Sequence, residues 1–124
     1  MMNLKGPNVI IKNFQNPDEV RYFEKGKFEL IKLNNMLIGK ATYNPGWKWS
    51  EHVSPLSKTK FCEVEHYGKV LSGSATVFLP NDHTYILKEG DLFYVSKKPH
   101  DSWVIGDQKY VSLHFLGAET YATD

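Results

Sequence analysis

The chain has 124 residues, 41% hydrophobic and 14% aromatic, a composition typical of one globular domain and not of a disordered chain. Its 15 Lys and Arg residues balance 14 Asp and Glu, so the net charge of +1 gives no sign of nucleic acid or an anionic membrane as a partner. Cys62 is the one cysteine, which excludes an intrachain disulfide and favours a reducing compartment. No apolar run approaches the roughly 20 residues of a membrane helix, and no signal peptide is recognisable, so we expect a soluble cytoplasmic protein.

Residues 1–27 carry few signals of regular structure, and we treat them as an N-terminal extension. Within NPDEVRYF, Asn16 is a candidate cap and Pro17 would occupy the first helical position, which predicts a short helical turn. The segment NVIIKNF, residues 8–14, is suited to adding a strand to the sheet edge of a second subunit. We therefore expect a homodimer.

From residue 28 onward, short runs of β-forming residues alternate with turn residues. Strands are expected at residues 28–33, 36–43, 60–71, 75–79, 84–88, 91–96, 102–106 and 109–115. Because the chain offers no helices to cover a parallel sheet, the strands should pair antiparallel. This spacing is typical of an all-β sandwich or barrel, so residues 28–124 should form one all-β domain.

The strand around His66 alternates between two faces. Cys62, Val64, His66, Gly68 and Val70 share one face, and charged residues dominate the other. The charged face should meet water, so His66 should point inward, where each polar nitrogen needs a partner. It is therefore either an ordinary hydrogen-bonded core histidine or a metal ligand, and the second interpretation requires other ligands to converge on it.

His52 and His100 are the other candidate ligands. His52 lies in the loop WKWSEHVSPLSKT, which leaves its direction open, and His100 follows Pro99 in a break between two strands. A loop histidine is most often solvated. However, neutral imidazole is the commonest transition-metal ligand, and three imidazoles together suit Zn, Fe, Cu or Ni.

These segments together resemble the cupin superfamily of small double-stranded β-helix (jelly-roll) barrels. Gly46 matches the opening glycine of the first cupin motif, and the interval from His66 to Gly73 matches its end, with His66 at the usual glutamate position. The segment GDLFYVSKKPH resembles the second motif, with Gly90 as its glycine and His100 as its histidine. More narrowly, PGWKWSEHV, CEVEHYGKVLSG and PHDSWVIGD are similar to segments of small single-domain cupins of the cupin-2, PGW-W-SEHV type. The resemblance implies a fold more than a reaction: residues 28–124 should form a cupin β-barrel, a double-stranded β-helix.

The sequence also departs from the cupin motifs. There is no HXH pair, since Ser50 stands at the first of these positions if His52 takes the second, and Ser96 replaces a proline. What the resemblance implies is a divalent transition metal (Zn, Fe, Ni or Mn) held at the barrel mouth by His52, His66 and His100, with open positions for water or substrate.

Two tryptophans and two further side chains are candidates for the walls of a ligand pocket. Trp49 and Trp103 each lie three residues from a candidate histidine, so at least one should line the cavity. Cys62 should be a small buried side chain beside His66. His114 is either a fourth ligand, a group behind the ligands or part of an outward polar face with Tyr110 and Ser112.

Glu51 is a possible carboxylate ligand, although its position beside His52 favours a solvated side chain or a supporting role. No paired acid and base is evident, so the sequence does not indicate a reaction type. Our main hypothesis is a small cupin that binds a divalent metal and a small organic ligand or substrate. The alternatives are a sensor that binds a small ligand without turnover and a metal-free structural barrel.

Overall fold

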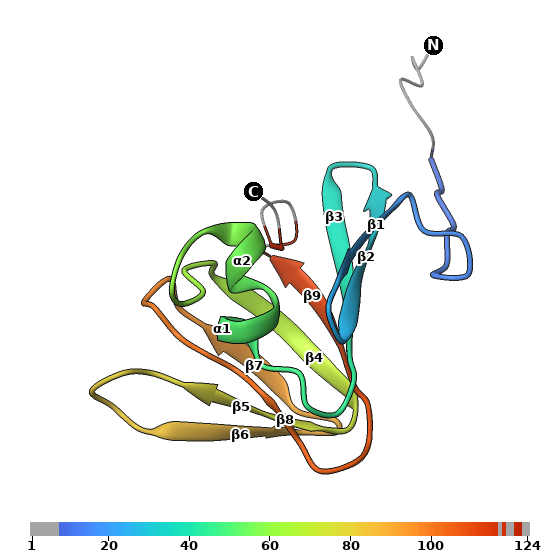
Figure 1. The fold of residues 1–124 in the computed structure, drawn as a ribbon. Helices are drawn as coiled ribbons and strands as arrows, with labels where there is room; N and C mark the ends of the chain where they lie inside the picture. The colour runs from blue at the N-terminus through green and yellow to red at the C-terminus, as the bar shows by residue number, and fades with distance from the viewer. Residues whose placement is uncertain (1–7, 117, 119–120, 123–124) are drawn as a thin grey trace.

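The structure, a computed structural model, describes residues 8–116, 118, 121 and 122. Within these residues the chain is mostly β-strand, with two four-residue helices (Figure 1). The elements in chain order are β1 (Glu19–Phe23), β2 (Gly26–Leu33), β3 (Met36–Tyr43), α1 (Trp49–His52), α2 (Ser54–Ser57), β4 (His66–Ser72), β5 (Ser74–Phe78), β6 (Thr84–Lys88), β7 (Leu92–Val95), β8 (Val104–Ile105) and β9 (Tyr110–Leu116).

The strands form two sheets. The larger has the order β1-β2-β3-β9-β4-β7 and the smaller the order β6-β5-β8. Every pairing between these strands is antiparallel, as expected for a chain without covering helices. Figure 1 shows β5 and β6 set apart from the β1–β3 end of the larger sheet, with β4, β7 and β9 between them.

One apolar core joins the two sheets. Phe28 of β2 and Val70 of β4, from the larger sheet, share a buried cluster with Ala75 of β5 and Val104 of β8, from the smaller. On β4, buried residues alternate with exposed ones from His66 onward, because successive strand side chains point to opposite faces. The predicted inward direction of His66 is confirmed.

The prediction of a short helical turn within residues 16–23 is wrong. Residues 19–23 instead form β1, which pairs antiparallel with β2 along its whole length. Lys25 makes the connecting turn with φ 65. A cap and a proline give only a weak local preference, and the pairing with β2 outweighs it. Part of the expected N-terminal extension therefore belongs to the larger sheet.

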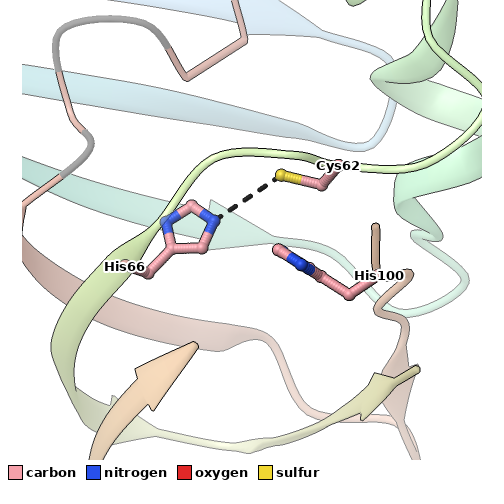
Figure 2. A group of neighbouring side chains, drawn as sticks. All are labelled: Cys62, His66 and His100. Carbon is pink, nitrogen blue, oxygen red and sulfur yellow. Dashed lines mark hydrogen bonds between the residues drawn. The ribbon is translucent and has the colours of Figure 1, made fainter. Parts of the chain in front are cut away.

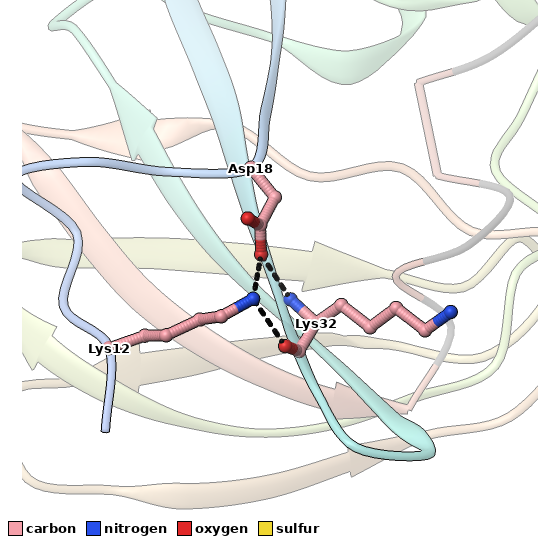
Figure 3. A network of polar contacts seen from close by, with 3 residues as sticks. All are labelled: Lys12, Asp18 and Lys32. Atoms are coloured by element: carbon pink, nitrogen blue, oxygen red, sulfur yellow. Dashed lines mark hydrogen bonds and ion pairs between the residues drawn. The ribbon is translucent and has the colours of Figure 1, made fainter. Parts of the chain in front are cut away.

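An ion pair fastens the segment before β1 to the end of β2 (Figure 3). The Lys12 ammonium donates to the Asp18 carboxylate at 2.9 Å and to the backbone carbonyl of Lys32 at 2.9 Å. The Lys32 N–H donates to the same Asp18 oxygen at 2.8 Å. The hydrogen bond from Lys32, and then the one from Lys12, lower the pKa of Asp18.

The turn between β4 and β5 depends on Gly73. Its φ is +79, in the region that favours glycine, and an added Cβ would lie 2.3 Å from the carbonyl oxygen of Lys109.

The described helices are too short to cross a membrane.

Candidate metal site

Cys62, His66 and His100 meet inside the barrel, as Figure 2 shows. One donor atom from each side chain lies within 4.8 Å of the others, and no residue of the three is more than 6% exposed. Sulfur and imidazole nitrogen are donors that zinc and copper prefer.

The backbone positions two of the three donors together. Cys62 and His100 form an isolated antiparallel bridge, in which the Cys62 N–H donates to the His100 carbonyl at 2.8 Å and the His100 N–H donates to the Cys62 carbonyl at 2.9 Å. His66 is the first residue of β4, and its inward direction follows from the alternation of that strand. Segments distant in sequence are thus fixed side by side.

The His100 ring is held by its own loop. Its Nδ1 lies 2.8 Å from the carbonyl oxygen of Lys98, which can only accept, so Nδ1 carries the proton and Nε2 keeps a free lone pair. The adjacent Asp101 fastens this loop to α1: its carboxylate accepts the Ser50 N–H at 3.0 Å, the Ser50 hydroxyl at 2.8 Å and the Ser102 N–H at 2.9 Å. A carbonyl behind a histidine ring is the usual support of a metal-ligating imidazole.

The distance between Cys62 Sγ and His66 Nε2 is 3.6 Å. Zinc bonds of about 2.3 Å to sulfur and about 2.0–2.1 Å to nitrogen, at tetrahedral angles, place these two donors about 3.5–3.6 Å apart. The separation therefore fits two ligands of one ion, and it also fits a hydrogen bond between thiol and imidazole. The other ring nitrogen of His66, Nδ1, is buried and has no hydrogen-bond partner among the described residues. It is left unpaired whichever of the two nitrogens carries the proton.

Burial sets the protonation states of the site. It is the main cause that lowers the pKa of His66 well below its usual value, with His114 and His100 adding to the effect. Burial also lowers the pKa of His100, against the opposing effects of the Lys98 carbonyl and Asp101. Both imidazoles are thus neutral near pH 7, the form that binds metal. Burial raises the pKa of the Cys62 thiol to about 12, so the thiol keeps its proton in the absence of a cation.

A cavity of about 50 Å³ adjoins the three donors. Aromatic, imidazole, hydroxyl and aliphatic side chains surround it, and no described lining residue is an Asp, Glu, Lys or Arg. The lining residues besides the three donors are Tyr43, Trp47, Trp49, Val77, Leu87, Phe93, Val95, Ser102, Tyr110, Ser112, His114 and Tyr121.

The structure does not bring His52 to this cluster. The loop that contains it forms α1, and its ring turns back on the start of that helix, where Nδ1 lies 2.9 Å from the Lys48 backbone nitrogen and 3.1 Å from the Lys48 oxygen. Its Nε2 lies 3.9 Å from a carboxylate oxygen of Glu24. Cys62 occupies the place in the three-donor group that the sequence pattern assigned to His52. Glu51 is exposed and lies outside the cavity lining.

The two candidate tryptophans lie in different places. Trp49, the first residue of α1, lines the cavity. Trp103 lies outside it, in a separate groove, where the ammonium of Lys48 sits 5.4 Å from its ring centre. Of the two candidates, Trp49 is thus the one beside the three donors, and Trp103 is not.

His114 lies beside the donors and not on an outward face. Its ring centre is 5.2 Å from that of His66, and its Nε2 is 3.0 Å from the hydroxyl of Ser112. Burial lowers the pKa of His114 to about 4. Its position on the inward face of β9 follows from the same alternation that places His66, so the inward interpretation was available from the sequence.

Tyr121 is a cavity residue that no sequence pattern predicted. Its ring centre lies 5.5 Å from that of His66, and its hydroxyl contacts the hydroxyl of Tyr43. Arg21 of β1 holds this segment by donating to the backbone carbonyls of Ala118 at 2.9 Å and Tyr121 at 2.7 Å. Tyr121 follows the last expected strand, where no periodic pattern indicates a direction.

No family model and no curated protein matches the sequence. Among solved structures, an uncharacterized conserved protein with a double-stranded β-helix domain from Klebsiella pneumoniae subsp. pneumoniae matches 97% of this chain and 94% of its own, with a TM-score of 0.60 and 13% identity. Oxalate decarboxylase from Bacillus subtilis matches 96% of this chain with a TM-score of 0.57 and 21% identity, and this chain covers 33% of it. Oxalate decarboxylase from Lactobacillus farciminis matches 83% of this chain with a TM-score of 0.59 and 19% identity, and this chain covers 32% of it. At these identities the likeness shows the fold alone: the chain forms a double-stranded β-helix barrel, the fold that the resemblance implied.

Proposed function

We propose that the chain binds a divalent transition metal through Cys62, His66 and His100, and that the adjoining cavity receives a small organic ligand or substrate. Zinc suits the mixture of one sulfur and two imidazole donors best. When bound, such an ion supplies a positive charge that polarises an oxygen of the ligand. The observation that carries the proposal is the convergence of three buried donors beside a cavity.

The protein's own groups prepare this site. The carbonyl of Lys98 holds the His100 proton on Nδ1 and leaves Nε2 as the donor. The reciprocal backbone bonds between Cys62 and His100 fix the spacing of two donors before an ion arrives. Three protein ligands leave at least one position of a tetrahedral ion for water or a ligand, which is the arrangement of catalytic zinc sites and not of closed structural ones.

The test is metal titration of the protein purified without added metal. Co²⁺ serves as a spectroscopic substitute for Zn²⁺, because a thiolate ligand gives a sulfur-to-cobalt charge-transfer band. We expect one equivalent of Co²⁺ to give this band, and Zn²⁺ to displace it. The Cys62→Ala variant should lose the band, and His66→Ala and His100→Ala should lose the tight equivalent.

His52→Ala is the matched control, since His52 is a partly buried histidine outside the three-donor group. It should bind metal as the unmodified protein does. Loss of metal in His52→Ala together with retention in Cys62→Ala would show that the ligand set is wrong. Absence of stoichiometric binding of Zn²⁺, Co²⁺, Ni²⁺, Fe²⁺ and Mn²⁺ would reject the metal site altogether.

A further inference from the structure

The outer face of the larger sheet carries a group of exposed apolar side chains at its β9-β4-β7 end. Buried and exposed residues alternate along β4, so the residues between the inward ones point away from the barrel. The same alternation holds on β7 and β9, which flank β4. We call the exposed apolar residues of these three strands the outer patch: Tyr67, Leu71, Leu92, Tyr94 and Phe115.

The outer patch has the character of an interaction surface. Leu92 is 78% exposed, although it lies in the middle of regular β-structure opposite Lys69. The rings of Tyr67 and Tyr94 lie side by side, 4.7 Å apart between their centres. A cluster of exposed apolar side chains on one face of a folded protein commonly marks a docking site.

The two edges of the larger sheet also differ. β1, at one edge, carries the charged residues Glu19 and Arg21. β7, at the other edge, has the sequence LFYV, with neither the charge nor the proline that commonly protects an edge strand from other chains. The edge next to the outer patch is therefore the one open to a partner.

A second group of exposed apolar residues lies near the start of the chain, in residues 8–14, which we call the arm. Val9 is 74% exposed and Ile11 is 89% exposed, whereas Ile10 between them is partly buried. Alternate exposure of three β-branched residues is the pattern of an extended segment that has one apolar side against its own chain and the other uncovered. Figure 1 shows the arm standing beside the β1–β3 end of the sheet, away from β7.

The arm is held on the same outer face that carries the outer patch. Lys40 of β3 alternates with the buried Ala41 and so points outward, and its ammonium lies 5.6 Å from the centre of the Phe14 ring. Lys12 is fastened to Asp18 and to the end of β2 (Figure 3). The arm thus occupies the β2–β3 end of the outer face, and the outer patch occupies the β4–β7 end.

We propose that two copies of this chain pack through the outer faces of their larger sheets, each with its arm against the outer patch of the other. A two-fold axis that runs between the sheets, parallel to the strands, reverses the strand order of one copy relative to its partner. The β2–β3 end of each copy then faces the β4–β7 end of the other, and both apolar groups are covered twice. The net charge of +1 gives little repulsion between the copies.

Sedimentation velocity on the metal-free protein tests the proposal independently of metal binding. We expect a dimer, and we expect Leu92→Glu and Ile11→Asp each to raise its dissociation constant by about a hundredfold or more, because each substitution places two uncompensated charges in a symmetric interface. Ile86→Glu is the matched control, since Ile86 is 57% exposed on β6 of the smaller sheet. It should leave the dissociation constant unchanged.

Photo-crosslinking identifies the contact itself. Ile11→Cys labelled with a benzophenone maleimide should give a dimer band whose crosslinked peptides come from β4, β7 or β9, and the buried Cys62 thiol should react slowly with the label.

A monomer at concentrations up to about 100 μM would overturn the proposal without any variant. A dimer that Leu92→Glu and Ile11→Asp leave unchanged would also overturn it, because the copies would then meet through another face. So would crosslinks that join the arm only to its own chain or to the smaller sheet of the partner, a result that does not depend on whether the charged variants fold.

Discussion

The Cys62 thiol should make metal affinity strongly dependent on pH. Metal coordination requires the thiolate, and burial raises the pKa of this thiol to about 12. At pH 7, removing its proton costs roughly 7 kcal/mol of the metal-binding free energy, since each pKa unit corresponds to about 1.4 kcal/mol. Each unit of pH increase removes one such step, so affinity should rise about tenfold per pH unit.

The two histidines of the proposed site should not add to this dependence above neutral pH. The pKa values of His66 and His100 are both lowered from 6.5, so the rings are already neutral between pH 7 and 9 and release no proton. The logarithm of the association constant for Zn²⁺ should therefore rise with pH with a slope near one. In Cys62→Ala the affinity should fall and the slope should be near zero.

Competition with a chromophoric zinc chelator between pH 7 and 9 measures the slope. Calorimetry in two buffers with different ionisation enthalpies counts the released proton independently. A slope near zero in the unmodified protein would refute the reasoning. A slope that persists unchanged in Cys62→Ala would also refute it, because the proton would then come from another group, such as a metal-bound water.

Three further substitutions should change the free energy of unfolding, which chemical denaturation measures. Burial lowers the pKa of His114 to about 4, so the unfolded state binds a proton more readily than the folded state between pH 6.5 and 4. The free energy of unfolding should therefore fall as the pH drops below 6.5, and the loss due to His114 should reach roughly 2 kcal/mol at pH 5. His114→Asn should remove this loss. Gly73→Ala should destabilise the fold by more than about 2 kcal/mol, because the new Cβ meets a backbone carbonyl at 2.3 Å; Gly90→Ala, with φ +91 but nothing within 4 Å, should cost only about 1 kcal/mol. Arg21→Ala should cost about 1–3 kcal/mol and speed amide exchange around Tyr121, because it leaves two backbone carbonyls of that segment without their donor.

If the free energy of unfolding falls between pH 6.5 and 5 by the same amount in His114→Asn as in the unmodified protein, His114 is not the group that takes up the proton on unfolding. Equal costs for the Gly73 and Gly90 substitutions would show that backbone conformation, and not the close approach, limits Gly73. Amide exchange around Tyr121 that does not change in Arg21→Ala would show that other contacts hold the C-terminal segment.

Strand alternation predicted most of the fold and the direction of His66. The antiparallel pairing followed from the lack of helices, and the expected strands overlap β2–β9. β1 was missed because its pairing with β2 is a tertiary interaction that outweighs the local signal of Asn16 and Pro17. The homodimer and the cytoplasmic location stay predictions.

The proposed ligand set depends on a bend of the chain that the alternation of strand residues does not predict. An unbroken strand from Cys62 to His66 would separate these residues by roughly 13 Å, at 3.3 Å per residue. β4 instead begins at His66, and the preceding segment bends so that the sulfur lies 3.6 Å from the ring nitrogen. The sequence placed both residues on one face but gave no sign of this bend. The direction of His52 depended on the loop forming α1, for which Lys48 provides no side-chain cap signal.

The backbone bridge between Cys62 and His100 also has a consequence for metal exchange. Two reciprocal hydrogen bonds, of 2.8 and 2.9 Å, couple the donor segments, so neither can move far without the other. An ion that binds at the proposed site therefore meets two donor segments that are already ordered, so its binding should not be coupled to folding. One ion can replace another in an already folded barrel. If the proposed site binds metal, its occupant should then follow the supply of ions and their preference for sulfur, and removal by a chelator should leave the fold intact.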